Sequence, residues 1–302
     1  MRFYLRLIVL ALLVFSLVVW RQLLRSQPHH RGDDPVTEVK DDFPLTFDTF
    51  LHVQQLRKKR LRSFCSSTNR VAKLLSNQQE ATRVLSRIRL NTQLDFLYCQ
   101  VPAIGLEGWE WLLQMLEEKA NVTVPVLVPH HQQRGKEKQL SKYDLTAIEA
   151  MLRSYTKVLF IRDPFQRLIS AYTKRMTNGQ TFSEFTQSIL DGGLRNASIE
   201  WRPLVSLCRP CLIQYDYVIM FGFLSHEVHH LFYHAGLPQD IHFPEFTDSQ
   251  IRWTYSWLSE QLFSELSLTQ RRRLSYFYRW DFDAFQFSTS LLRDFPSSSS
   301  NQ

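Results

Sequence analysis

Glycine is scarce in this chain, with 9 residues among 302, and no segment repeats at a fixed period. Both absences argue against a repeat array and against a low-complexity scaffold. Hydrophobic residues make up 44% of the sequence and aromatic residues 13%, which excludes bulk disorder. The length suits one large α/β domain or two small domains.

Long apolar runs are also absent, except at the N-terminus. Residues 7–20 are apolar apart from Ser16, and a helix over residues 7–24 would be long enough for a short membrane span. The small residues of a signal-peptidase site are missing after this run, which continues as V-V-W-R-Q-L-L-R. We therefore expect an uncleaved signal-anchor at 7–24, preceded by a cytoplasmic tail at 1–6, with the rest of the chain on one side of the membrane.

Cysteine is limited to four residues, at positions 65, 99, 208 and 211. An even number is typical of an oxidising compartment. Cys208 and Cys211 form a C-x-x-C pair, but Cys65 and Cys99 do not have the spacing of a second zinc-binding pair. We therefore expect disulfides or buried thiols and no metal, and the connectivity stays open.

Acidic residues are outnumbered by basic ones, 29 against 36, which gives a formal charge of +7. Such an excess favours an anionic partner such as nucleic acid, acidic lipid or acidic polysaccharide, although a basic protein without such a partner also fits. No nucleic-acid-binding module is recognisable, so we expect no nucleic acid partner. The basic run at 57–60 lies in a polar segment, 50–90, and is predicted to be the solvated face of a helix.

Strands and helices alternate along most of the chain. We predict a stem at 25–48, one domain at 49–290 and a disordered, serine-rich tail at 291–302. Alternation of this kind predicts an α/β fold with a mainly parallel sheet. The predicted strands are 94–101, 157–162 and 217–220. The predicted helices include one capped by Asp144 and ending at Ser154, one from Asp163 to about Met176, and one capped by Ser225 and ended by Gly236.

The most specific motif is R-D-P-F-Q-R-L-I-S-A-Y, at residues 162–172. It follows a predicted strand and opens a helix, with Asp163 at the N-cap and Pro164 at the first helical position. Ligands of open α/β sheets bind at such strand ends, and a helix N-terminus offers N–H groups to a phosphate. Arg162 would add a bidentate clamp and Ser170 a hydroxyl donor. The alternative interpretation is a capped helix that merely buries aromatic side chains.

This motif resembles R-D-P-F-x-R-L-x-S-A-Y, the 3′-phosphate-binding motif of Golgi carbohydrate sulfotransferases. The resemblance is greatest to chondroitin, dermatan and N-acetylgalactosamine 4-O-sulfotransferases. The segments 201–216 and 278–282 are similar to the family's W-x-P … L-C-x-P-C-x-I-x-Y-D and Y-x-x-D-F patterns, so the likeness covers about residues 60–285. It implies that the 3′-phosphate is bound by Arg162, Asp163, Pro164, Phe165, Arg167 and Ser170.

The same resemblance implies a sulfotransferase fold related to nucleotide kinases. It also implies that the domain lies in the Golgi lumen, held by the type II anchor at 7–24. The co-substrate would be 3′-phosphoadenosine 5′-phosphosulfate, with no metal, and the acceptor an anionic or neutral glycan. The acceptor's identity, the carbon sulfated and the oligomeric state stay open.

The family's second cofactor loop, V-P-K-V-G-C-[ST]-N-W-K-R, corresponds to V-P-A-I-G-L-E-G-W-E-W at residues 101–111. Pro102 and Gly105 are kept, and the resemblance assigns them to cofactor binding. Ala103 stands at the lysine position, and Glu107 and Glu110 stand at a hydroxyl and a basic position. The loss of one oxyanion donor alone lowers a rate by about 10²–10³.

A third departure concerns the general base, because Glu200 stands where the family has histidine. A carboxylate can deprotonate an acceptor hydroxyl, so Glu200 is the candidate base. Two interpretations therefore compete. One is a working carbohydrate O-sulfotransferase. The other is an inactive relative that binds a glycan, a nucleotide or a Golgi enzyme.

Two further patterns are present. Residues 226–230 read H-E-V-H-H and match the H-E-x-x-H signature of zinc hydrolases, but no third ligand stands at a known spacing. This zinc hydrolase is a remote alternative. The N-x-[ST] tripeptides at Asn121 and Asn196 are predicted N-glycosylation sites, which agree with a lumenal location.

Overall fold

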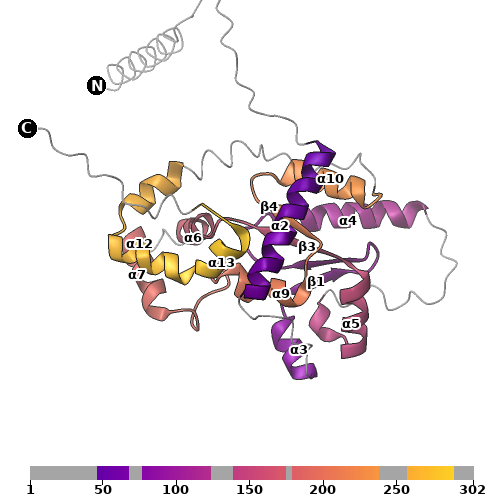
Figure 1. Ribbon diagram of the computed structural model, residues 1–302, viewed down its shortest axis with the longest axis horizontal. Coiled ribbons are helices and arrows are strands. Elements are labelled where there is room, and N and C mark those ends of the chain that lie inside the picture. The colour runs from indigo at the N-terminus through magenta and orange to yellow at the C-terminus, as the bar shows by residue number, and fades with distance from the viewer. Residues whose placement is uncertain (1–45, 68–76, 124–138, 175–178, 238–256, 289–302) are drawn as a thin grey trace, which may run out of the picture. The chain divides into compact units, whose positions relative to one another are not determined.

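A computed structural model describes residues 46–67, 77–123, 139–174, 179–237 and 257–288 (Figure 1). All of them belong to one unit, Pro44–Gln302. The predicted cytoplasmic tail, signal-anchor and C-terminal tail lie outside the described residues, as does the stem up to residue 45, and they stay predictions. Among the helices described, none combines the length and hydropathy needed to cross a membrane.

The centre of the fold is a four-stranded sheet in the order β1-β2-β3-β4. Strand β1 pairs antiparallel with β2, whereas β2, β3 and β4 are parallel to one another. The predicted, mainly parallel α/β architecture is thus confirmed. The carboxyl ends of the three parallel strands meet at one edge of the sheet. The strands are β1 (Ile88–Asn91), β2 (Phe96–Cys99), β3 (Thr156–Ile161) and β4 (Tyr217–Met220).

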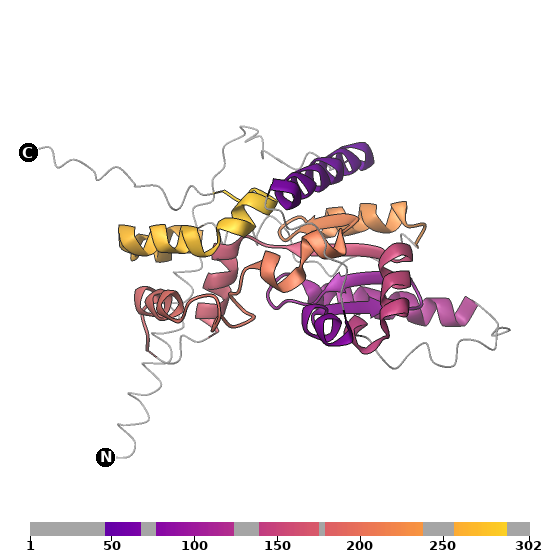
Figure 2. The same cartoon turned by 60° about the horizontal axis from the view of Figure 1, so that its bottom comes forward.

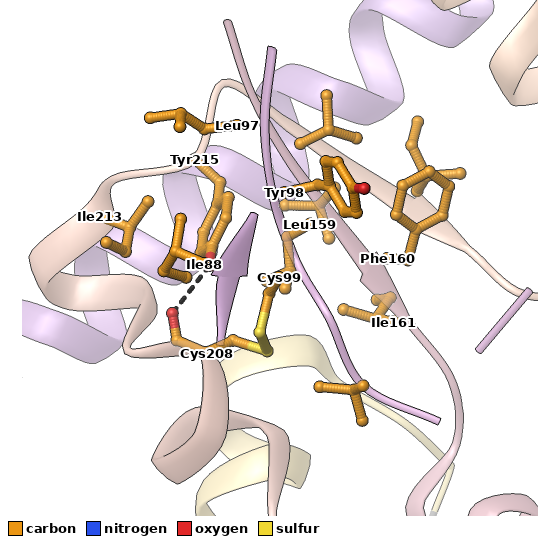
Figure 3. Packing of buried hydrophobic residues seen from close by; sticks show 14 of the residues in the cluster. Ile88, Leu97, Tyr98, Cys99, Leu159, Phe160, Ile161, Cys208, Ile213 and Tyr215 are labelled. Carbon is orange, nitrogen blue, oxygen red and sulfur yellow. Dashed lines mark hydrogen bonds between the residues drawn. A yellow bond between two sulfur atoms is a disulfide. The ribbon is translucent and has the colours of Figure 1, made fainter. Parts of the chain in front are cut away.

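The helices α4 (Leu106–Thr123) and α10 (Leu224–His234) follow β2 and β4. The Trp109 ring lies 5.2 Å from Phe160 of β3 and 5.7 Å from Phe232 of α10, measured between ring centroids. This fully buried tryptophan therefore ties both helices to the sheet, and Figure 3 shows the packing of residues on β1, β2 and β3 nearby. Helix α2 (Phe47–Ser67) packs against β4, α10 and other helices.

A second hydrophobic cluster lies among α6 (Pro164–Thr173), α7 (Phe182–Gly192), α12 (Leu268–Phe277) and α13 (Arg279–Phe285). Figures 1 and 2 both show these helices gathered together. Its centre is aromatic, with Phe165 of α6 only 4.6 Å from Phe263 between ring centroids. The remaining elements are α3 (Gln78–Val84), the 3-10 turn η2 (Leu140–Lys142), α5 (Leu145–Ser154), α8 (Leu204–Cys208), α9 (Pro210–Ile213) and a helix at 257–264.

The predicted helix ends are partly confirmed. Asp144 caps α5 by accepting a hydrogen bond from the Ala147 N–H at 2.7 Å, and that helix ends at Ser154. Ser225 does not cap α10, because the helix already begins at Leu224, whose side chain is buried. Gly236 follows the end of α10 with φ of 67°, as expected of a helix terminator. Helix α6 ends at Thr173, short of the predicted end near 176.

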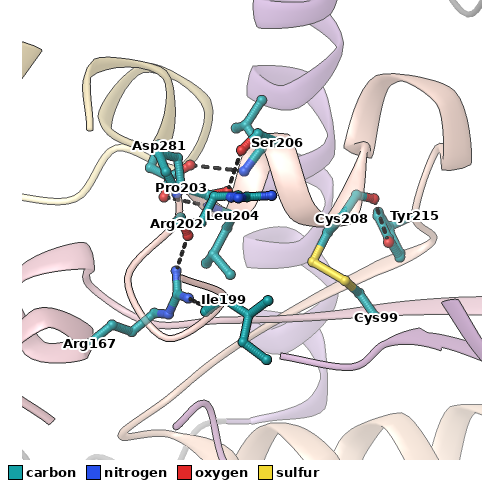
Figure 4. Close-up of a disulfide and its surroundings, with 11 residues drawn as sticks. Cys99, Arg167, Ile199, Arg202, Pro203, Leu204, Ser206, Cys208, Tyr215 and Asp281 are labelled. Carbon is teal, nitrogen blue, oxygen red and sulfur yellow. Dashed lines mark hydrogen bonds between the residues drawn. A yellow bond between two sulfur atoms is a disulfide. The ribbon is translucent and has the colours of Figure 1, made fainter. Parts of the chain in front are cut away.

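All four cysteines form disulfides, Cys65–Cys211 and Cys99–Cys208. The first joins α2 to α9, and the second joins the end of β2 to the end of α8 (Figure 4). The C-x-x-C pair therefore serves two separate cross-links. This connectivity could not be read from the sequence, because each bridge spans more than 100 residues, 146 and 109 respectively.

Removal of the Cys99–Cys208 bridge by the paired substitutions Cys99→Ala and Cys208→Ala is expected to lower the free energy of unfolding by about 3–5 kcal/mol, because the bridge closes a long loop in the unfolded chain. Urea unfolding of the full chain in detergent measures this difference. Thiol alkylation checks that Cys65 and Cys211 stay paired. A change below about 1 kcal/mol would contradict the cross-link.

Candidate functional site

Three chain segments converge where the parallel strands β2, β3 and β4 end, and Arg162, which belongs to one of them, contacts the other two. This residue directly follows β3 and is 2% exposed. Its Nη1 donates a hydrogen bond to the carbonyl oxygen of Ala103, after β2, at 2.7 Å. Its guanidinium carbon lies 4.0 Å from the ring centroid of Phe221, after β4. Arg162 thus stands at the strand edge where α/β proteins bind ligands.

The start of α6 is capped as predicted, with a consequence for phosphate binding. Asp163 Oδ1 accepts hydrogen bonds from the N–H groups of Phe165 at 2.8 Å and Gln166 at 3.2 Å. The Arg167 N–H donates to the carbonyl oxygen of Asp163, and Pro164 has no N–H. The first N–H groups of α6 are therefore occupied. The expectation that they bind a phosphate stays a prediction, and a phosphate at this strand edge would have side chains such as Arg162 as its available donors.

The Asp163 carboxylate that caps α6 is largely buried. Burial raises the pKa of Asp163 to about 6, against the opposing influence of the two backbone N–H donors and of Arg162. Asp163 thus acts on the backbone of α6, and its carboxylate oxygen is turned toward the helix rather than toward a ligand.

A line of polar side chains runs along α6 beside Arg162. Gln166 Oε1 accepts a hydrogen bond from Arg162 Nε at 3.5 Å, and Ser170 lies one turn further along the same helix face. Ser170 is 8% exposed, and its carbonyl oxygen accepts from the Thr173 hydroxyl at 3.1 Å. Gln166 was not predicted as a site residue. The i, i+4 spacing to Ser170 was the signal that could have found it.

The loop after β2 has the tight backbone that its sequence predicts. Gly105 has φ of 85°, and a Cβ atom there would lie 2.4 Å from Leu224 Cδ1. Glycine is therefore required both for the conformation and for close approach to α10. Ala103 has φ of 62° without being glycine. Pro102 and Ala103 are both partly exposed on this loop. Because residue 103 is alanine, the position of the family's lysine carries no charged side chain.

The two glutamates near this loop lie on the first turns of α4. Glu107 is exposed, whereas Glu110 accepts hydrogen bonds from the Tyr98 hydroxyl and from Gln100 Nε2, both at 3.3 Å. Burial and the nearby Glu110 carboxylate raise the pKa of Tyr98. Both glutamates line a cavity of about 480 Å³ between α4 and the strands β1 and β2.

The segment 199–205, which carries the candidate base Glu200, is held by side chains from α6 and α13 and by Tyr278 between α12 and α13. Arg167 donates to the carbonyl oxygens of Ile199 and Arg202, both at 3.0 Å (Figure 4). It also donates to the carbonyl oxygen of Glu200 at 3.2 Å. The Tyr278 hydroxyl donates to the carbonyl of the intervening Trp201 at 2.7 Å. Four successive carbonyls are thus fixed by buried donors.

The same segment is held from its other end by Asp281. Its carboxylate accepts from the N–H groups of Leu204 at 2.8 Å and Val205 at 2.9 Å, at the start of α8. Burial raises the pKa of Asp281 to about 6, which the two backbone donors and Arg167 oppose. The Glu200 side chain itself is partly exposed.

The motif residues therefore divide into two groups. Arg162 and Ser170 line the strand edge and α6. Pro164, Phe165 and Arg167 are buried, Phe165 in the aromatic cluster and Arg167 with 0% exposure beneath the 199–202 turn. The resemblance assigns Arg167 to the nucleotide, whereas its contacts make it a support for the segment that carries Glu200.

The H-E-x-x-H pattern on α10 has a structural use. Glu227 is 3% exposed and makes two contacts with Arg57 of α2, at 2.7 and 2.9 Å, while it also accepts from the Met220 N–H. The His230 ring packs against Phe50 with ring centroids 5.6 Å apart. Among the described residues, no three His, Cys, Asp or Glu side chains form a metal-binding group. The ion pair with Arg57 explains Glu227 without zinc.

The two predicted glycosylation sites differ in setting. Asn196 is exposed in a turn after α7, where an oligosaccharide has room. Asn121 lies in the last turn of α4, and its side chain is outside the described part of the chain.

Comparisons with known proteins agree with this arrangement. A family model described as "Sulfotransferase family" matches residues 86–288. Carbohydrate sulfotransferase 8 of Mus musculus is 30% identical over 89% of this chain and 73% of its own length. Carbohydrate sulfotransferase 9 of Homo sapiens is 28% identical over 79% of this chain, and carbohydrate sulfotransferase 14 of Danio rerio 30% over 64%.

The chain spans 61% of the human protein and 60% of the Danio rerio protein. No solved structure matches. The family model covers two thirds of this chain and includes both loops of the strand edge, and the chain therefore belongs to the sulfotransferase family, in which its relatives are carbohydrate sulfotransferases.

Proposed function

We propose that this chain transfers a sulfonyl group from 3′-phosphoadenosine 5′-phosphosulfate to a hydroxyl group of a glycan. The observation that carries the proposal is the position of Arg162, a cation at the carboxyl edge of the parallel sheet that contacts the loop after β2 and the loop after β4. Membership of the sulfotransferase family supports the same donor.

The side chains near Arg162 suit a phosphate monoester. Arg162 would supply charged N–H donors, and Gln166 and Ser170 would add neutral ones along α6. The 102–105 loop would face the phosphosulfate. The sulfur–oxygen bond to the acceptor forms as the bond to the bridging phosphate oxygen breaks, and 3′,5′-adenosine diphosphate leaves. Glu200 would take the proton of the acceptor hydroxyl.

The loop after β2 is the feature that would favour the alternative, an inactive relative of the enzyme. Ala103 provides no ammonium group for the charge that develops on the leaving oxygens, and Arg57 of the basic helix α2 is already paired with Glu227. The positive dipole end of α4 would stabilise part of that charge. We therefore expect a slower transfer than a lysine-bearing loop would give.

The acceptor that we propose is a glycan of the chondroitin, dermatan or N-acetylgalactosamine type, in the Golgi lumen. The two disulfides support an oxidising compartment of the secretory route. The exposed Asn196 supports the same side of the membrane. A type II anchor at 7–24 would place the described domain there.

The first test is a thermal shift of the full chain in detergent with 3′,5′-adenosine diphosphate. At 100 times the dissociation constant, binding adds about 2.7 kcal/mol, which corresponds to a rise of roughly 5–10 °C for a domain of this size. Radiolabelled sulfate transfer to chondroitin and to an N-acetylgalactosamine-terminated oligosaccharide follows. A thermal shift with transfer supports the proposal. A shift without transfer would indicate an inactive nucleotide-binding relative, and no shift would refute donor binding.

A further inference from the structure

A second cavity, of about 840 Å³, lies at the opposite end of the parallel strands from Arg162. It is bounded by the second half of α2, by α5, by the start of β3 and by residues 210–216. Lys157, the second residue of β3, lines it, while Arg162 directly follows that strand. The two residues are five positions apart along an extended chain, which corresponds to about 17 Å.

The cavity carries an excess of positive charge. Its lining includes four cations and two carboxylates, namely Lys58, Arg62, Arg153, Lys157, Glu149 and Asp216. Lys157 Nζ lies 2.8 Å from Asp216 Oδ2, and Arg153 lies 3.7 Å from Glu149. These two pairs use two of the four cations. Lys58 and Arg62 therefore leave the lining with a net charge of +2, and a concave surface with a net positive charge attracts an anion.

Lys157 is the most firmly held charged residue of the cavity lining. This lysine is 8% exposed, and its ammonium group also donates to the carbonyl oxygen of Tyr155 at 3.1 Å. Asp216 holds the Lys157 side chain and also accepts from the Lys157 N–H at 2.9 Å. These contacts fix the position of the wall formed by the start of β3 and Asp216, while the charge that is left for an anion comes from Lys58 and Arg62.

The other walls are apolar and cross-linked. Leu61, Leu152 and Ile213 line part of the cavity, and Leu152 is the least buried of the three, so it would offer the apolar contact to a sugar ring. The disulfide Cys65–Cys211, which also lines it, joins α2 to α9 and fixes the distance between two of the walls. A preorganised cavity with apolar walls and cationic groups favours a ligand with ring faces and negative charges.

We propose that this cavity binds a sulfated or carboxylated segment of a glycan chain, away from the edge where transfer takes place. The choice of a glycan as the ligand rests on the proposed function. Such a site would hold a long acceptor at two points and raise its effective concentration at the strand edge. Short acceptors, which reach only one site, would gain nothing from it.

The test measures binding of a fluorescent chondroitin sulfate dodecasaccharide to the full chain in detergent, with no nucleotide present. The double variant Lys58→Ala with Arg62→Ala removes the two cations of the lining that are not in the Lys157–Asp216 and Arg153–Glu149 ion pairs. The matched control is Lys59→Ala with Arg60→Ala, which removes the same charge from exposed positions of the same helix outside the cavity lining.

We expect the cavity variant to bind at least tenfold more weakly and the control less than threefold. Arg62→Glu, at an exposed position, provides a second variant if the pair impairs folding, with the same expected loss. Equal losses in cavity and control variants would show unspecific attraction to a basic helix and overturn the proposal, as would no binding by the wild type. The thermal shift with 3′,5′-adenosine diphosphate should be unchanged in all variants, which separates this site from the donor site.

Discussion

Replacement of Arg162 with alanine is expected to raise the dissociation constant for 3′,5′-adenosine diphosphate at least 100-fold. Hydrogen bonds to charged groups contribute about 1.5–3 kcal/mol each, so a guanidinium that donates two to a phosphate accounts for a factor of this size. No backbone N–H of the first turn of α6 can compensate, because Asp163 occupies those of Phe165 and Gln166. Isothermal titration of the full chain measures the change.

Two variants serve as controls for this result. Arg162→Lys keeps the charge but lacks the planar fork, and should bind with intermediate affinity. Gln166→Ala removes a neutral group and should weaken binding less than tenfold. Since Arg162 also donates to Ala103, the melting temperature without nucleotide is measured for each variant. If the affinity of a well-folded Arg162→Ala protein for 3′,5′-adenosine diphosphate falls less than fivefold, the phosphate does not bind at this strand edge.

The elements with strong local signals could be predicted from the sequence. Strand β4 lies at the predicted residues, and Asp144 and Asp163 both cap helices as expected. Such signals are carried within a few residues of chain, by apolar runs and by a capping side chain next to the N–H groups that it accepts from. Strand β1 gave no such signal, because its sequence, I-R-L-N, continues a polar segment and its strand form depends on pairing with β2, a contact that the local sequence does not show.

The sequence identified which residues belong to the site but not where their side chains lie. The motif gave the identity of Arg162 and Arg167, yet only packing decides that the first lies at the strand edge and the second beneath the 199–202 turn. Nearly all side chains of α6 are buried, so burial alone does not separate these roles. The contacts of Arg167 with residues 199–202 join segments more than 30 residues apart, which no local pattern predicts. The same limit applies to the disulfides, whose partners lie more than 100 residues apart.

Substitution of Arg167 by methionine is expected to lower the free energy of unfolding by about 3–5 kcal/mol, because a fully buried guanidinium that donates to three partly buried carbonyl oxygens is lost. It should also lower the rate of transfer, since the turn held by Arg167 carries Glu200. Methionine keeps much of the apolar volume, so the change concerns hydrogen bonds rather than a cavity. Urea unfolding and steady-state kinetics of the full chain measure the two effects.

The pattern of the kinetic loss distinguishes a positioning residue from a merely structural one. If Arg167 positions Glu200, kcat should fall at least tenfold while KM for the donor stays within about twofold, because Arg162 is untouched. Arg271→Met on α12 is the matched control, because it removes another buried guanidinium, which donates to the carbonyl oxygen of Leu266, before that helix, at 3.1 Å. That variant should lose stability and keep kcat. Equal losses of kcat in the two variants would show that Arg167 contributes only to stability. The proposal that Glu200, in the 199–202 turn, takes the proton of the acceptor would then lose its support.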